Sequence, residues 1–97
     1  MRIVAKIGTS SITDAGGAIS VSMVESLCAQ VAELRQSGHE VLVVTSGAVA
    51  GGVAALGFAS RPSDTATLQA LAAAGQSRLM GHYNAAFDKH GLVGAQV

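Results

Sequence analysis

The sequence contains little cysteine and few aromatic side chains, and it carries no net charge. Cys28 is the only cysteine among the 97 residues, so no internal disulfide can form. The three histidines also lack the spacing of metal ligands, and we therefore predict no metal site. Six basic residues balance six acidic ones, which leaves no strongly basic surface of the kind that binds nucleic acid.

Long apolar runs are absent as well. The aliphatic stretch Val41–Val44 is far shorter than the roughly 20 residues that a membrane-spanning helix needs. The N-terminal segment MRIVAKIGTS also lacks the apolar core of a signal peptide. We therefore predict a cytoplasmic protein with no membrane partner.

Apolar residues make up 49% of the chain, and their pattern in the first half predicts a strand, a helix and a second strand. Residues 2–7 are rich in β-branched side chains and precede a glycine and hydroxyl loop, which is typical of a short strand. The motif Ser22-x-x-Glu25 predicts a helix start by a capping box, and Gly38 predicts its end. Glu40–Thr45 contains a continuous aliphatic run with no polar alternation, as expected for a parallel strand covered on both faces.

The second half of the chain reads as helical. We predict a short helix over Ala48–Leu56, a break at Arg61–Asp64 and a helix over Thr65–Ala74. A further helical segment covers Gln76–Lys89, and Gly75 either kinks the helix or separates the two segments.

Residues 92–97 resemble the first half of another strand with no terminating signal. We therefore expect the sheet to be larger than residues 1–97 alone can build. Strands that alternate with helices predict an α/β architecture with a mainly parallel sheet. Ligands of such sheets bind beyond the carboxyl ends of the strands.

Lys6 is the first candidate functional residue, because a lone ammonium in an apolar strand must reach an anion or the solvent. The loop that follows, Gly8-Thr9-Ser10, offers backbone N–H groups and two hydroxyls, and its glycine permits close approach of a phosphate. This combination predicts a phosphate cradle, although it is not a Walker A loop. The alternative is that Lys6 lies on an edge strand and points to water.

The second candidate is the turn Ser46-Gly47-Ala48, which follows the second strand. Free N–H groups at such a strand-to-helix transition favour a carboxylate or a phosphate. Ser46 is not a nucleophile elbow, because Val44 stands where G-x-S-x-G requires glycine. The alternative is that Ser46 only caps the following helix.

Other polar residues give weaker signals. Asp14, Asp64 and Asp88 stand beside turns or helix ends, where a capping or solvated role is the ordinary one. Arg78 follows Gly75 and either reaches a phosphate or a subunit neighbour or lies on a solvated helix face.

The segments VAKIGTSSIT, GHEVLVVTSGAVAGG, LGF followed by RP, and AAAGQSRLM resemble, in order and spacing, the opening of the amino acid kinase family, in particular its members that phosphorylate glutamate. The resemblance covers essentially all 97 residues and implies the three-layer α/β sandwich of that family, with residues 1–97 as the N-terminal part of its kinase domain. It implies transfer of the γ-phosphoryl group of ATP to the side-chain carboxylate of L-glutamate, which gives glutamyl 5-phosphate for proline biosynthesis.

By the same resemblance, Lys6 contacts the ATP phosphates and acts as the catalytic lysine, and Gly8, Thr9 and Ser10 line the phosphate site. Ser46, Gly47 and Ala48 bind glutamate. The family also implies Mg²⁺ with ATP, a homo-oligomer and inhibition by proline. Leu68 departs from the pattern, since many members carry lysine there.

The family's kinase domain continues beyond position 97 with the residues that complete both substrate sites. We therefore expect residues 1–97 to be inactive alone. Two other functions stay open: a sister kinase acting on carbamate, N-acetylglutamate, aspartate or a nucleoside monophosphate, and a non-catalytic α/β module that binds a nucleotide or a protein partner.

Overall fold

The computed structural model describes residues 1–97 and contains two strands and three α-helices in the order β1, α1, β2, α2, α3. The strands β1 (Arg2–Ile7) and β2 (Glu40–Thr45) are joined by α1 (Val21–Gln36). After β2 come the short helix α2 (Ala48–Ala55) and the long helix α3 (Thr65–Asp88). The predicted α/β architecture with a parallel sheet is confirmed.

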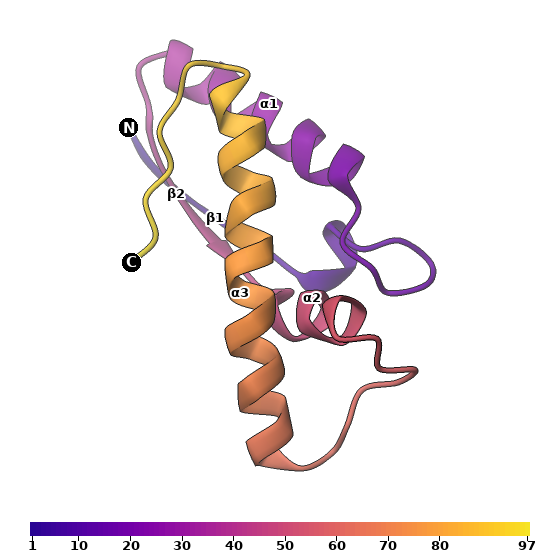
Figure 1. The fold of residues 1–97 in the computed structure, drawn as a ribbon. Helices are drawn as coiled ribbons and strands as arrows, with labels where there is room; N and C mark the ends of the chain where they lie inside the picture. Colours follow the sequence, from indigo (N-terminus) through magenta and orange to yellow (C-terminus); the bar gives the residue numbers. More distant parts are fainter.

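The two strands pair in parallel with Arg2 opposite Glu40 and Ile7 opposite Thr45. Because the register is level, both strands end at the same edge of the sheet. Figure 1 shows α2 beyond this edge, beside the middle of α3, while α1 and α3 run along the length of the strands.

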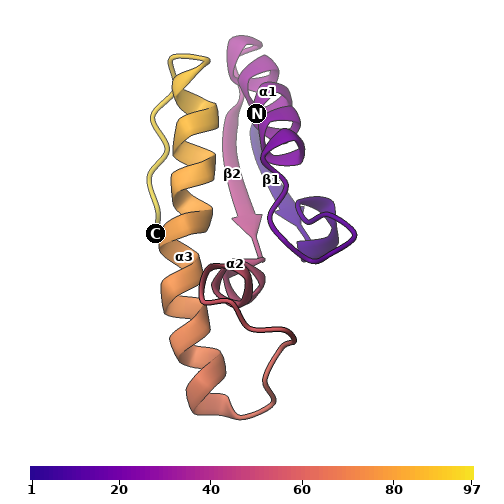
Figure 2. The ribbon, with the colours of Figure 1, turned by 45° about the vertical axis from the view of Figure 1, so that its right-hand side comes forward.

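The helices α1 and α3 cover one face of the sheet only. The core beneath them is formed by buried residues of α1, α3 and the loop after β1, with strand residues Ile7 and Val43 packed against it. The fully buried members of this core are Ile12, Val24, Cys28 and Leu79. Figure 2 shows the sheet with the helices beside it.

The opposite face of the sheet is open, which corrects the prediction that β2 is covered on both faces. Burial alternates along both strands, and the outward positions Val4, Leu42 and Val44 keep 62%, 52% and 47% of their surface exposed. An aliphatic strand predicts that both faces can be covered, but no helix within residues 1–97 lies on the second one. The third layer of the expected sandwich is therefore not part of this segment.

The start of α1 also differs from the prediction. The helix is capped by Ser20, whose hydroxyl accepts from the Met23 N–H at 3.4 Å, and not by a box of Ser22 and Glu25. The reason lies in the preceding loop, where Thr13 and Ile19 form an antiparallel bridge that delivers the chain directly to Ser20. Ser22 then falls in the first turn.

The long helix α3 is continuous through Gly75, so Gly75 does not separate two helices. Asp64 caps its N-terminus and accepts from the Thr67 N–H at 2.9 Å. The segment 92–97 forms no strand, contrary to the prediction, because it lies against α3 near Asn84 and Phe87 and pairs with neither edge of the sheet.

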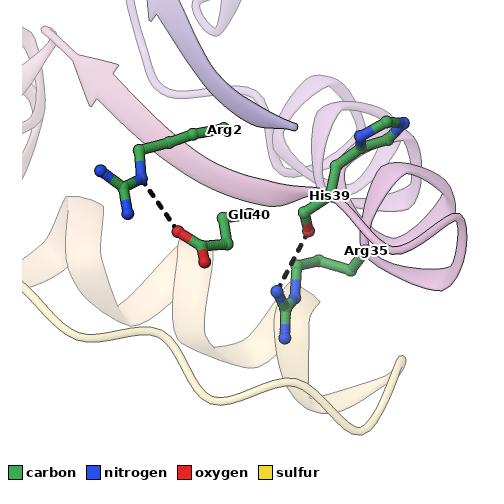
Figure 3. A network of polar contacts seen from close by, with 4 residues as sticks. All are labelled: Arg2, Arg35, His39 and Glu40. Atoms are coloured by element: carbon green, nitrogen blue, oxygen red, sulfur yellow. Dashed lines mark hydrogen bonds and ion pairs between the residues drawn. The ribbon is translucent and has the colours of Figure 1, made fainter.

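The two strands begin with an ordered polar network, at the end of the sheet opposite α2 (Figure 3). Arg2 and Glu40 form an ion pair at 2.9 Å, and Arg35 of α1 donates to the carbonyl of His39 at 3.1 Å. Both members of the ion pair are highly exposed, so we expect it to contribute less than about 1 kcal/mol. This network joins α1 to the start of β2 and has no part in the candidate site.

None of the helices is both long enough and apolar enough to cross a membrane.

Candidate functional site

The candidate site lies at the carboxyl edge of the sheet, where the loop after β1 meets the turn after β2. Thr9 Oγ1 donates to Ser46 Oγ at 3.1 Å, so the two loops touch directly through their hydroxyls. The Ser46 N–H also donates to the carbonyl of Ile7 at 3.1 Å. The structure thus brings together two segments that stand 37 residues apart.

The loop after β1 presents an unbroken row of donors. Its residues form a single 3₁₀ turn over Thr9–Ser11, in which the Ser11 N–H donates to the carbonyl of Gly8. The N–H groups of Gly8, Thr9 and Ser10 have no acceptor within the protein, and all three residues are exposed. Consecutive free N–H groups form a concave site that suits a phosphate.

The turn after β2 depends on Gly47. Its φ angle is +113°, a left-handed value that favours glycine, and it is the N-cap of α2. A Cβ atom at this position would also lie 3.0 Å from Ile12 Cδ1, so a side chain there would require Ile12 to shift by a few tenths of an ångström. The N–H groups of Gly47 and Ala48 have no acceptor within the protein.

Ser46 is more constrained than its sequence context indicated. Its hydroxyl accepts the bond from Thr9 and donates to the carbonyl of Ile7 at 3.3 Å. A carboxylate ligand can therefore receive the Ser46 proton only if the hydroxyl turns away from Ile7. That bond is long, and the Ile7 carbonyl keeps the Ser46 N–H, so the change is a small one.

Lys6 lies on the open face of the sheet, in register with Val44. It is exposed and forms no ion pair, since the ion pairs of the structure are Arg2–Glu40 and Lys89–Glu25. Its charge is therefore free to meet an anion, and it is the only charged group among the predicted site residues.

Arg78 lies elsewhere. With His82 it lines a cavity of about 210 Å³ between α2 and α3, and none of the predicted phosphate or glutamate residues lines that cavity. Leu68 is a partly buried residue of the first turns of α3. Neither residue joins the two loops.

Sequence reasoning missed the support beneath the Ser46 turn. Thr45 Oγ1 lies 2.8 Å from the hydroxyl of Tyr83, which is buried in the core. Burial raises the pKa of Tyr83, and the hydrogen bond with Thr45 offsets only part of that rise. The available signal was a tyrosine on the apolar face of a helix, because a buried hydroxyl needs a partner.

Comparisons with known proteins identify the family of the chain. The sequence profile described as "Amino acid kinase family" matches residues 1–97. Over 96 residues, or 99% of the chain, the sequence is 47% identical to a glutamate 5-kinase of Marinomonas sp. (strain MWYL1) and 51% identical to one of Bacillus cereus (strain ATCC 10987 / NRS 248). It is 46% identical to a glutamate 5-kinase of Symbiobacterium thermophilum over the same span. The chain covers 26% of the length of the first two relatives and 37% of the third.

Proposed function

Because the chain belongs to the amino acid kinase family, we propose that it carries the phosphate-donor loop and part of the acceptor turn of an enzyme that phosphorylates the side-chain carboxylate of L-glutamate with ATP. The observation that carries the proposal is the hydrogen bond between Thr9 and Ser46, which holds two donor-rich loops at one sheet edge. The names of the relatives support glutamate as the acceptor. The product of this reaction is glutamyl 5-phosphate, which serves proline biosynthesis.

Phosphoryl transfer depends mainly on position and on stabilisation of charge, and the loop after β1 has the groups for both. The free N–H groups of Gly8, Thr9 and Ser10 would hold phosphate oxygens of ATP. The unpaired ammonium of Lys6 would neutralise charge that develops on the transferred group.

The turn after β2 would hold the acceptor. The free N–H groups of Gly47 and Ala48 suit a carboxylate, and the Ser46 hydroxyl adds a third donor once it turns from Ile7. The bond from Thr9 would keep the acceptor turn at a fixed distance from the phosphate loop, as an in-line transfer requires.

The donor set of this segment fits phosphate oxygens and does not fit Mg²⁺. The seven site residues include no carboxylate, and no group of three histidine, cysteine or acidic residues gathers anywhere in the chain. Mg²⁺ prefers carboxylate, phosphate and water oxygens. We therefore assign no metal ligand to residues 1–97.

The test is an acceptor panel on the full-length protein. We expect ADP release that depends on L-glutamate, with an acyl phosphate that hydroxylamine traps. Turnover with aspartate, N-acetylglutamate, carbamate or uridine monophosphate in place of glutamate would instead assign a sister kinase. Nucleotide binding with no turnover on any acceptor would favour the non-catalytic module.

Within that assay, Lys6→Ala should lower turnover by about two to three orders of magnitude, the scale of losing one charge-stabilising group. Ser46→Ala should mainly raise the KM for glutamate. Lys89→Ala is the matched control. Lys89 is also exposed, but it lies at the C-terminal end of α3, where it pairs with Glu25 of α1. Equal turnover of Lys6→Ala and Lys89→Ala would remove Lys6 from the reaction.

A further inference from the structure

The hydroxyl of Tyr83 is the one polar group that reaches the candidate site from the core. The residue is 3% exposed and packs among Cys28, Leu79 and Ala86, which offer the hydroxyl no hydrogen-bond partner. Its partner is Thr45 Oγ1 at 2.8 Å, at the last position of β2. The helix α3, which also packs against the turn through Gly75 and Leu79, is thereby hydrogen-bonded to the residue before Ser46.

The direction of this hydrogen bond follows from the second contact of Thr45. Thr45 Oγ1 also lies 3.1 Å from the carbonyl oxygen of Ser46, to which it donates. A hydroxyl has a single proton, so Thr45 must accept from Tyr83 while it donates to Ser46. The result is a directed relay from the Tyr83 hydroxyl through Thr45 to the Ser46 carbonyl.

The relay fixes more than a carbonyl. The Ser46 carbonyl and the Gly47 N–H belong to the same planar peptide unit and point in opposite directions. The hydrogen bond from Thr45 Oγ1 holds the oxygen of that unit on the side of the Thr45 hydroxyl. The Gly47 N–H, which has no acceptor within the protein, is therefore aimed to the other side.

Gly47 makes this restraint necessary. Glycine gives the peptide units on either side of it unusual freedom, and the left-handed φ of +113° is only one of the conformations open to it. Ile12 beneath the turn limits side-chain volume there, but it does not select the orientation of the peptide.

We propose that Tyr83, acting through Thr45, is a positioning residue that sets the orientation of the Ser46–Gly47 peptide and so aims the Gly47 N–H at the acceptor carboxylate. The identity of the ligand rests on the proposed function. The orientation of the peptide does not, and it can be measured without any substrate.

The experiment compares four single variants of the full-length protein, together with the double variant of Tyr83→Phe and Thr45→Val, with the wild type. Tyr83→Phe and Thr45→Val each remove one hydroxyl of the relay and keep the shape of the side chain. Thr45→Ser keeps the hydroxyl and is the rescue variant. Thr67→Val removes a hydroxyl of the α3 cap and is the matched control.

Two readouts are taken. In protein labelled with ¹⁵N-glycine, we expect the Gly47 amide signal to move or broaden in Tyr83→Phe and Thr45→Val, while the signal of the distant Gly38 stays unchanged. In the kinase assay, we expect the KM for glutamate to rise by about 3- to 10-fold, the effect of one neutral hydrogen bond, with the KM for ATP unchanged. Combining the two substitutions should have no larger effect than either alone, because they break the same relay.

A Gly47 signal identical to wild type in both relay variants would overturn the proposal, even if those variants melt earlier, because Tyr83 would then be a purely structural residue. A moved Gly47 signal in Tyr83→Phe, restored position in Thr45→Ser and no change in Thr67→Val would support it. Should the wild type fail to phosphorylate glutamate while the Gly47 signal responds in this way, the positioning role would stand and the proposed function would fall.

Discussion

At the scale of the residue, Cys28 illustrates a group whose chemistry is decided by burial. Its side chain is fully buried between α1 and α3, and burial raises the pKa of the thiol from 9.0 to about 11. The thiolate is the reactive form of cysteine. Cys28 therefore behaves as a small apolar residue at neutral pH.

The raised pKa of Cys28 predicts a loss of stability in alkali. In the unfolded chain the thiol releases its proton above about pH 9, whereas the folded protein retains it up to about pH 11. The free energy of unfolding should therefore fall across this window, by at most about 2 to 3 kcal/mol.

Urea unfolding at several pH values between 8 and 11 measures this loss, with Cys28→Ala as the reference. Burial raises the pKa of Tyr83 in both proteins, and the charge of Cys28 raises it further in the wild type, so the difference between the two proteins reports Cys28 together with its effect on Tyr83. Parallel curves for the wild type and the variant would contradict the prediction.

The sequence also indicated much of the candidate site at the residue scale, for a local reason. Lys6, Gly8 and Ser46 stand at or next to the ends of strands, where residues of these types favour anion binding. The bonds between Thr9 and Ser46 and between Thr45 and Tyr83 could not be predicted in this way, because each joins segments nearly forty residues apart.

At the scale of the element, three glycines explain why the helices α2 and α3 pack so closely: Gly51 and Gly52 of α2 and Gly75 of α3. A Cβ atom on Gly75 would lie 1.6 Å from the Ala48 carbonyl oxygen and 2.4 Å from the Gly52 backbone nitrogen. A Cβ atom on Gly52 would lie 2.0 Å from the Leu71 carbonyl oxygen. The sequence predicted the helices but indicated Gly75 only as a kink or a break between two helices, because helical periodicity does not reveal which backbone lies opposite.

We expect Gly75→Ala to destabilise the protein strongly, because the added methyl group must push α2 away from α3. Alanine has the higher helix propensity by about 1 kcal/mol, so any net loss reflects the close packing. Gly81→Ala is the matched control in the same helix, since a Cβ atom there meets nothing within 4 Å, and it should stabilise slightly.

Thermal unfolding of the two glycine variants decides the point. A melting temperature of Gly75→Ala at or above that of Gly81→Ala would show that the helices do not need this glycine. Because Ala48 also begins α2, we expect Gly75→Ala to disturb the acceptor turn as well.

At the scale of the whole molecule, the open face of the sheet is the feature that local patterns could not predict. The continuous aliphatic run of β2 correctly predicted a strand, but it did not predict that one face of the strand is exposed. No helix within residues 1–97 lies on the second face, and the chain covers 26% of the length of its relatives from Marinomonas and Bacillus cereus.

This open face predicts how the 97-residue polypeptide behaves when it is produced alone. Val4, Leu42 and Val44 form an apolar strip along two strands that are both edges, and such a surface promotes association. We expect size-exclusion chromatography with light scattering to show a mass that rises with concentration. Leu42→Glu should reduce this association, because it places a charge in the strip.

Leu56→Glu separates the effect of the strip from a general gain in solubility. Leu56 is 56% exposed, close to the 52% of Leu42, but it lies at the end of α2 and outside the sheet. If association is driven by the open face, Leu56→Glu should leave it unchanged. A monomeric wild type at every concentration, or equal effects of the two substitutions, would mean that the uncovered sheet is not the surface through which this segment associates.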